Sequence, residues 1–150
     1  MSTHAAIGIR LNDGRIKAIY CHFDGYPAGV GITLAGCYAT QERVEALLEL
    51  GSLSSLGAKL APEPGQHHSF LSPIDNVTVA YHRDRGEQIQ PGYLYPDLTA
   101  YIKGGQDDFA AEYLYLYEDG EWSYLDLFGR REWIRLAEFF GKADADQSGN

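Results

Sequence analysis

The chain has 150 residues, is 45% hydrophobic and 22% charged, and carries a net charge of -9 at pH 7. This length fits a single domain with one core, and the composition excludes disordered and fibrous classes. The charge excludes a general nucleic-acid binder, which needs Lys and Arg to displace counterions. It leaves two classes open: an ordinary soluble acidic protein, or one that offers an acidic surface to a basic partner.

The sequence also indicates a compartment. No apolar run approaches the roughly 20 residues that a membrane span needs, and the first residues lack the pattern of a secretory signal. Two cysteines, Cys21 and Cys37, are too few for a disulfide framework. We therefore expect free thiols, a cytoplasmic location, no membrane contact and no cofactor.

The first element expected is a β-hairpin. Residues 5–11 and 15–23 alternate as strands around Asn12-Asp13-Gly14, and Asp-Gly between apolar runs favours a tight turn. His22 would then share a sheet face with Tyr20, whereas Cys21 would lie on the other face. A two-residue turn at Asp13-Gly14 would pair Leu11 with Ile16, Ile9 with Ala18 and Ile7 with Tyr20. A three-residue turn would change this register.

Helices and one further strand are expected in the middle of the chain. Pro27 favours the start of a glycine-bearing helix, and Thr40 is placed to cap a helix over 41–50 that ends at Gly51. Residues 51–72 are loop-like, with a short helical turn at 52–57. A third strand is expected over 76–82. Asp97 then caps a helix over 98–103, which Gly104-Gly105 would end.

A second hairpin is predicted over 111–118 and 121–128, with Asp119-Gly120 as its turn. One face carries leucines and the other carries aromatic side chains: Tyr113, Tyr115, Tyr117, Trp122 and Tyr124. These aromatics either pack beneath a last helix over 131–140, through Trp133, or form an exposed platform. We favour the covered arrangement, because soluble monomers rarely expose so large an apolar patch.

These elements do not alternate as β-α-β units, which favours an α+β fold. The expected architecture is an antiparallel sheet of about five strands, made of two β-hairpins and a middle strand, with helices on one face or end. Residues 1–140 would form one domain, and residues 141–150 a polar, flexible tail.

The densest group of reactive side chains is Tyr20-Cys21-His22-Phe23-Asp24. Cys and His can serve as nucleophile and base, but neighbours on a strand point to opposite faces, which argues against that pair. A metal site of His22, Asp24 and His82 would match no standard zinc spacing. We therefore expect neither a catalytic residue nor a metal ligand here. The plainer alternative is a hydrogen-bonded histidine beside a turn.

A second group is His82-Arg83-Asp84-Arg85-Gly86-Glu87. Its two arginines could bind a phosphate or carboxylate, because a guanidinium offers paired donors. The alternative is local ion pairing on a solvated turn. If the first and third strands are neighbours, His22 would share a polar pocket with His82, Arg83 and Arg85.

Three segments together resemble a family of small proteins encoded by bacteriophages and prophages. They are Ile19-Tyr20-Cys21-His22-Phe23-Asp24-Gly25-Tyr26-Pro27-Ala28-Gly29-Val30-Gly31, then Leu48-Glu49-Leu50-Gly51-Ser52-Leu53-Ser54-Ser55-Leu56-Gly57, and then Ala80-Tyr81-His82-Arg83-Asp84-Arg85-Gly86-Glu87. A tryptophan is expected in that family where this chain has Phe23. The family's function is undefined, so no catalytic or ligand residue can be transferred. The resemblance implies phage origin, accessory size and action in the cytosol of the host bacterium.

The expected function is therefore inhibition of a bacterial anti-phage defence system by binding. The protein could bind a defence protein through acidic and aromatic surface, as an anti-CRISPR does, or sequester a nucleotide immune signal. The alternative is a small metal-dependent or His/Asp hydrolase acting on a nucleotide-like substrate. No direct DNA binding is expected, and a homodimer through the aromatic face is plausible. The candidate binding residues are His22, Asp24, Tyr26, His82, Arg83, Arg85, Tyr115, Tyr117 and Trp122.

Overall fold

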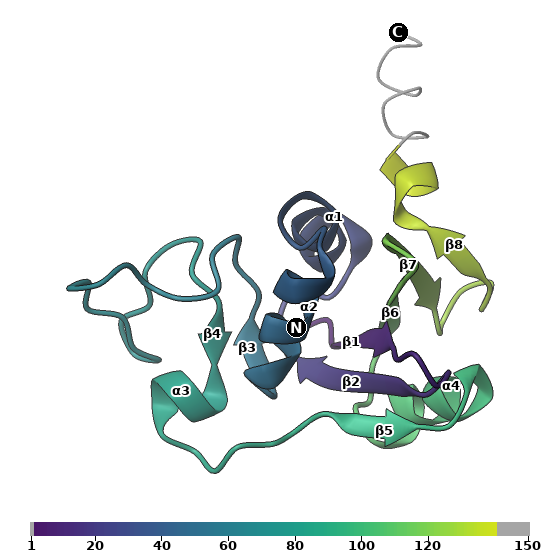
Figure 1. The fold of residues 1–150 in the computed structure, drawn as a ribbon, viewed down its shortest axis with the longest axis horizontal. Coiled ribbons are helices and arrows are strands. Elements are labelled where there is room, and N and C mark those ends of the chain that lie inside the picture. Colours follow the sequence, from purple (N-terminus) through teal and green to yellow (C-terminus); the bar gives the residue numbers. More distant parts are fainter. Residues whose placement is uncertain (1, 141–150) are drawn as a thin grey trace, which may run out of the picture.

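The computed structural model describes residues 2–140, which form one mixed sheet with helices on both faces (Figure 1). The described strands are β1 (Ala5–Arg10), β2 (Ile16–Cys21), β3 (Leu53–Ser55), β4 (Val79–Ala80), β5 (Tyr93–Tyr95), β6 (Tyr113–Glu118), β7 (Glu121–Asp126) and β8 (Trp133–Arg135). The helices are η1 (Pro27–Gly31), α1 (Ile32–Cys37), α2 (Gln41–Glu49), α3 (Tyr81–Arg85) and α4 (Leu98–Asp107). Residues 141–150, the predicted tail, lie outside this description.

The sheet is larger than predicted, and it is not purely antiparallel. Its order is β4-β3-β2-β1-β6-β7-β8, with β5 paired to β2 beside this path. The pairs β1/β6 and β2/β3 are parallel. The α+β class holds broadly, but an antiparallel sheet of about five strands was wrong. Each of the unforeseen strands has only three residues, too few to show an alternating pattern.

The first hairpin forms, but in a different register from the one predicted. Its loop has three residues, because the Leu11 N–H donates to the Arg15 carbonyl at 2.7 Å and Gly14 takes φ +92°. The register pairs Ile7 with Ile19, where the two-residue turn paired Ile7 with Tyr20. A shift of one residue exchanges the two faces of a strand. Ile7, Ile9 and Ile19 therefore share one core, and Ile16 and Tyr20 lie on the opposite face.

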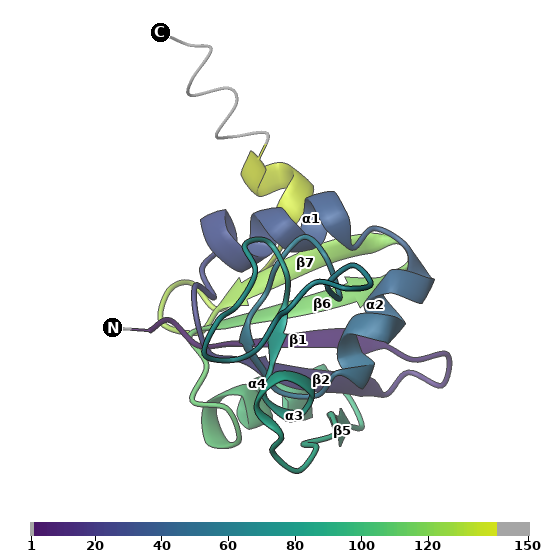
Figure 2. The ribbon, with the colours of Figure 1, turned by 90° about the vertical axis from the view of Figure 1, so that its left-hand side faces the viewer.

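The second hairpin was predicted correctly. Glu118 pairs with Glu121 across a turn in which Asp119 has φ +52° and Gly120 φ +78°. Leucines and aromatics occupy opposite faces, as expected. The leucine face packs toward α4, and the aromatic face lies beneath η1 and α1 (Figure 2).

The end of the chain differs from the prediction. A strand, β8, takes the place of the first part of the helix predicted over 131–140, and of those residues only 136–140 are helical. Trp133 lies on the α4 face, stacked on Tyr101 with ring centroids 6.2 Å apart. It therefore cannot cover the aromatic face of the second hairpin. Leu136 contributes to that core instead.

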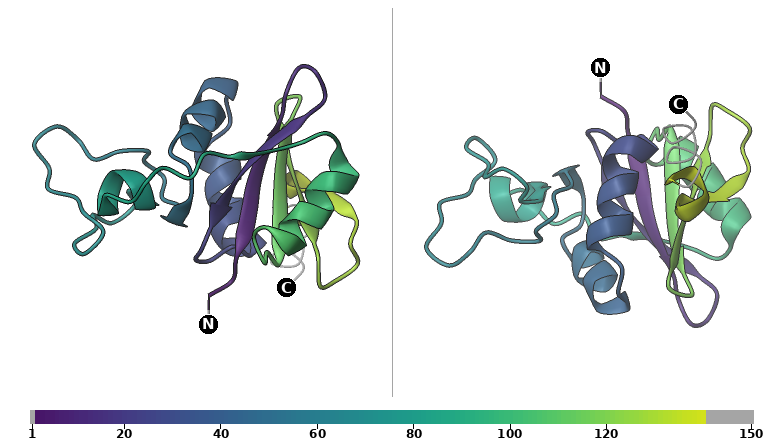
Figure 3. Two further views of the ribbon diagram at one scale, coloured as in Figure 1. Left: turned by 90° about the horizontal axis from the view of Figure 1, so that it is seen from below. Right: turned by 90° about the horizontal axis from the view of Figure 1, so that it is seen from above.

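The predicted helix caps are present. The Thr40 side chain accepts from the Arg43 N–H, and the Asp97 side chain accepts from the Ala100 N–H. However, α4 continues through Gly104 and Gly105, where we predicted its end. A Cβ on Gly104 would overlap the Tyr95 ring, and one on Gly105 would overlap Leu114. These glycines let the helix lie against the sheet (Figure 3).

Two other local expectations were wrong. Residues 81–85 form the helix α3 where we predicted the end of a strand, and residues 53–55 form β3 where we predicted a helical turn. As a result β3 lies between β2 and β4, so the two segments that carried the candidate motifs are not neighbouring strands. None of the helices in the described part of the chain has the length and apolar content needed to cross a bilayer.

Candidate binding site

A pocket opens where the sheet divides along the outer edge of β2. This edge pairs with β5 over Ile16–Ala18 and with β3 at Cys21, so Ile19 and Tyr20 lie between the two partners (Figure 1). We call the resulting pocket, of about 630 Å³, the fork pocket. The residues that line it are His4, Ala18, Ile19, Tyr20, Ser52, Gln90, Pro91, Gly92, Tyr93, Asp107, Asp108, Phe109 and Ala110.

One wall of the fork pocket is aromatic. Tyr20 and Phe109 are stacked, with ring centroids 6.2 Å apart and planes at 16°. Tyr93 meets Phe109 edge-on at 5.1 Å. Phe109 is buried, whereas Tyr93 keeps 48% of its surface exposed. The wall therefore combines a fixed ring with an accessible one.

The lining of the pocket also carries two acidic side chains next to Phe109 in the sequence. Asp107 ends α4 and Asp108 is its C-cap, and both carboxylates are exposed. The C-terminus of a helix also carries partial negative charge from its carbonyl groups. The Tyr95 hydroxyl donates to Asp108 Oδ2 at 2.8 Å, which fixes that side chain. No Lys or Arg lines the pocket among the described residues, so the two carboxylates are the only side chains in its lining that are always charged at neutral pH.

One histidine of a close pair lines the pocket. His4, just before β1, lies in the pocket wall, and its ring centroid is 4.7 Å from that of His22, just after β2. His22 Nδ1 lies 2.7 Å from the Tyr20 hydroxyl. Burial and then the charge of His4 lower the pKa of His22, and burial raises the pKa of Tyr20 to about 12. A hydrogen bond thus joins the Tyr20 hydroxyl to His22 Nδ1, and the lowered pKa of His22 favours the neutral imidazole.

Cys21 cannot act as a nucleophile with His22. Its side chain lies in the core on the other face of the sheet, fully buried. Burial raises the pKa of this thiol to about 12, which leaves almost no thiolate at neutral pH. Both Cys21 and Cys37 are free thiols in the structure.

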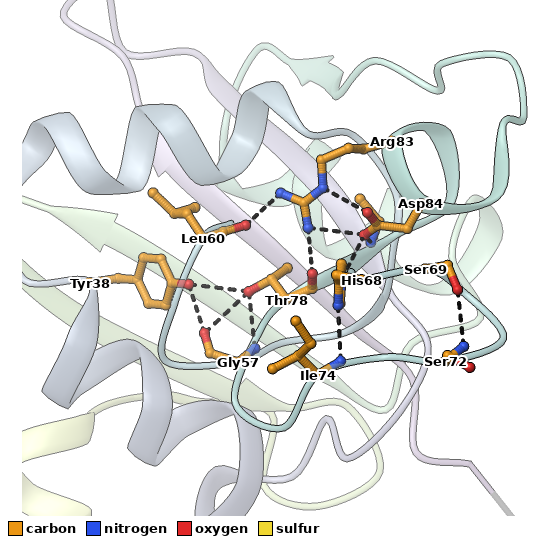
Figure 4. A network of polar contacts seen from close by, with 11 residues as sticks. Tyr38, Gly57, Leu60, His68, Ser69, Ser72, Ile74, Thr78, Arg83 and Asp84 are labelled. Carbon is orange, nitrogen blue, oxygen red and sulfur yellow. Dashed lines mark hydrogen bonds and ion pairs between the residues drawn. The ribbon is translucent and has the colours of Figure 1, made fainter. Parts of the chain in front are cut away.

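Arg83 belongs to the scaffold and not to an open site. Its guanidinium donates to the carbonyls of Leu60 and Thr78 and forms a paired contact with Asp84, with both N–O distances at 2.9 Å (Figure 4). Asp84 also accepts the Ala80 N–H at 2.8 Å. These contacts tie the long loop after β3 to the start of α3. The donors of Arg83, one of the two arginines proposed to bind a phosphate, are therefore directed inward at the protein's own chain.

Two neighbouring groups complete this network. His68 Nε2 lies 3.3 Å from Asp84 Oδ2, and both side chains are almost fully buried. His68 Nδ1 accepts the Ile74 N–H at 3.0 Å, so this histidine has no nitrogen left to act as a base. Figure 4 shows the Tyr38 hydroxyl donating to the Gly57 carbonyl, at 2.7 Å, on the other side of the loop.

The remaining residues of the second motif have local partners. Arg85 Nε lies 3.0 Å from Glu87 Oε2, and its guanidinium lies over the rings of Phe70 and Tyr81. His82 Nδ1 lies 2.6 Å from the Glu87 carbonyl oxygen. None of the residues predicted to share a polar pocket, namely His22, His82, Arg83 and Arg85, lines the fork pocket. Each of these side chains contacts another partner within the protein.

Asp24 and Tyr26 form the turn that leads into η1. Asp24 takes φ +58°, and its carbonyl accepts the Val30 N–H at 2.9 Å. The Tyr26 hydroxyl donates to Asp24 Oδ1 at 3.3 Å, and the Tyr26 ring is 41% exposed. The plainer reading of Asp24, as a turn residue, is the one that this geometry fits.

The aromatic residues proposed for partner binding are buried in this chain. Tyr115, Tyr117 and Trp122 are each at most 5% exposed. Their polar atoms are used internally: the Tyr115 hydroxyl donates to the Gly25 carbonyl at 2.6 Å, and Trp122 Nε1–H donates to the Tyr38 carbonyl at 2.8 Å. They can serve neither as a partner surface nor as the face of a homodimer.

The sequence reading missed most of the fork pocket, since of its lining residues only Ile19, Tyr20 and Ser52 lay within a motif singled out. One signal was available: Asp107-Asp108-Phe109 places two carboxylates and a ring together just after a capped helix. Its pairing with Tyr20 and His4 depends on the parallel docking of β6 on β1, which no local pattern indicates. Within the described residues, no group of three or more His, Cys, Asp or Glu could hold a metal ion.

Comparisons of this chain with protein-family models, with curated proteins and with solved structures gave no match.

Proposed function

We propose that this protein is a phage accessory protein that inhibits a bacterial defence protein by binding it in the host cytosol. The observation that carries the binding mode is the fork pocket, which joins an aromatic wall to two exposed carboxylates. Aromatic rings are enriched where proteins bind one another, and an acidic surface favours a basic partner. The net charge of -9 supports the same direction. The phage origin rests on the three motifs of the sequence.

Capture of a nucleotide signal has less support. Binding of a phosphate needs cationic or backbone hydrogen-bond donors. Among the described residues that line the fork pocket there is no Lys or Arg. Arg83 is bound to Leu60, Thr78 and Asp84, and Arg85 is paired with Glu87. A phosphate group entering beside Asp107 and Asp108 would meet like charge.

The hydrolase alternative finds no favourable geometry among the residues proposed for it. His22 is hydrogen-bonded to Tyr20, His82 lies against the Glu87 carbonyl, and Asp24 accepts from Tyr26. A catalytic base needs a nitrogen or oxygen directed at a substrate site. Each of these side chains is instead committed to a neighbour within five residues of it in the sequence.

Phage plating tests this proposal. Strains that carry different defence systems are infected with and without the protein, and we expect one system to lose protection when it is present. The sensitised strain then supplies lysate from which the tagged protein should retain a component of that system. The double variant Asp107→Asn/Asp108→Asn should lose both effects, while Asp119→Asn, in the turn of the second hairpin, should keep them. If no system is blunted, the proposal is wrong.

A further inference from the structure

We infer that the fork pocket receives a guanidinium group, supplied by an arginine side chain of the bound partner. This inference rests on the proposed function for the identity of the partner, but the chemistry of the pocket stands on its own geometry. The acidic side chains of the pocket offer the oxygens of Asp107 and the remaining oxygen of Asp108. No Lys or Arg within the described residues lies within 4.0 Å of either carboxylate.

The aromatic wall distinguishes guanidinium from other cations. A guanidinium is planar and weakly hydrated, so it can stack on a ring while its edge donates to carboxylates. The exposed ring of Tyr93 lies beside the stacked Tyr20–Phe109 pair, which gives a flat cation a surface to cover. An ammonium group is a strongly hydrated point charge and gains less from such a wall. We therefore expect arginine to bind more tightly than lysine.

The surface around the pocket fits a peptide chain on either side of that arginine. Exposed apolar side chains continue from Tyr93 along the segment that enters and forms β5: Ile89 is 41% exposed and Leu94 52%. The N–H and C=O groups of Leu94 face away from β2, because those of Tyr93 and Tyr95 pair with it in the antiparallel ladder. β5 has β2 as its sheet partner in the described chain and lies at the lower margin in Figures 1 and 2. The partner's arginine would thus enter beside an uncovered edge.

The test uses small probes and the whole protein. N-acetyl-arginine amide is titrated against the labelled protein, with chemical shifts of Tyr20, Tyr93 and Phe109 as the readout. N-acetyl-citrulline amide, which has the same shape without the charge, is the matched control. We expect saturable arginine binding near about 1 mM, as befits one charge-assisted pair with stacking. Lysine amide should bind more weakly, and citrulline amide at least about tenfold more weakly.

Variants locate the site. Asp107→Asn/Asp108→Asn should weaken arginine binding about tenfold and leave the fold intact, because Asn keeps an oxygen for the Tyr95 hydroxyl. Asp119→Asn should leave binding unchanged. Equal binding of arginine and citrulline amides, or no saturation at about 10 mM arginine amide, overturns the inference. If phage plating shows no inhibition while the probe binds as expected, the proposed function fails and the guanidinium site stands.

Discussion

His4 directly precedes β1 and His22 directly follows β2, and their ring centroids lie 4.7 Å apart. Burial is the larger cause that lowers the pKa of His22, and the charge of His4 is the second. We predict that the imidazole proton signals of His22 titrate with a midpoint below the ordinary value of 6.5. His4→Ala should raise that midpoint without restoring it fully, because burial remains. A midpoint at or above 6.5 in the parent protein would contradict this account.

The same shift gives stability a pH dependence with a definite sign. The unfolded chain protonates His22 at its ordinary pKa, and the folded chain only at a lower pH. The unfolded state therefore binds more protons in this window, and the free energy of unfolding falls as pH drops below about 6.5. The decline levels off below the folded pKa. Urea unfolding at several pH values should show a smaller decline in His22→Gln, in which position 22 does not titrate.

Replacing Arg83 by lysine should destabilise the protein, although this substitution keeps the positive charge. Arg83→Lys keeps a cation but cannot reach two carbonyls and both oxygens of Asp84 at once. We expect the free energy of unfolding to fall by about 2 kcal/mol, since buried acceptors would be left unpaired. Arg15→Lys is the matched control, because its pair with Asp13 is exposed and such pairs contribute little to stability. Equal effects in urea unfolding would show that the Arg83 network is not structural.

Two glycines in helices should respond in opposite directions to the same substitution. Gly36 lies in α1 with nothing within 4 Å of a built Cβ, so Gly36→Ala should stabilise by about 0.5–1 kcal/mol through helix propensity. A Cβ on Gly104 would overlap the Tyr95 ring, so Gly104→Ala should destabilise, by about 1–3 kcal/mol. Thermal unfolding measures both. A stabilising Gly104→Ala would mean that α4 does not lie this close to β5.

Substitution of a buried tyrosine should lower stability, whereas substitution of a tyrosine in the pocket wall should lower partner binding. Tyr115→Phe leaves the buried Gly25 carbonyl without its donor, and we expect a loss of about 1–3 kcal/mol with partner binding retained below the melting temperature. Tyr93→Ala removes a half-exposed ring from the pocket wall, and we expect reduced retention of the partner. Its effect on stability should be smaller than that of Tyr115→Phe. Pull-down from the sensitised strain, alongside thermal unfolding, distinguishes the two outcomes. Normal retention by Tyr93→Ala would remove this ring from the interface.

The sequence was most informative where local chemistry decides structure. Thr40 and Asp97 marked helix starts, and Asp119-Gly120 marked a two-residue turn, because each signal acts within four residues. Asp13-Gly14 is the same dipeptide but lies in a three-residue loop, so the dipeptide alone did not determine the register of the hairpin. One residue of error then placed every side chain of one strand on the wrong face.

The candidate site depended on contacts between distant segments, and it was therefore largely missed. Arg83 read as a free cation because its acceptors, the carbonyls of Leu60 and Thr78, have no sequence signature. The fork pocket arises from β5 pairing with half of β2. A three-residue strand that pairs across more than 70 residues of chain leaves no periodic pattern from which either partner could be named.

The loop at Asn12-Asp13-Gly14 determines which face of the sheet carries His22 and Tyr20. A chain with one residue fewer at this position would turn β2 over, presenting Ile19 and Cys21 to the pocket and placing the imidazole in the core. Selection on the pocket would therefore act on the number of residues in this distant, solvent-exposed loop more strongly than on their identity, apart from Gly14. Insertions and deletions there, which surface loops usually tolerate, would be inherited as changes in the binding site.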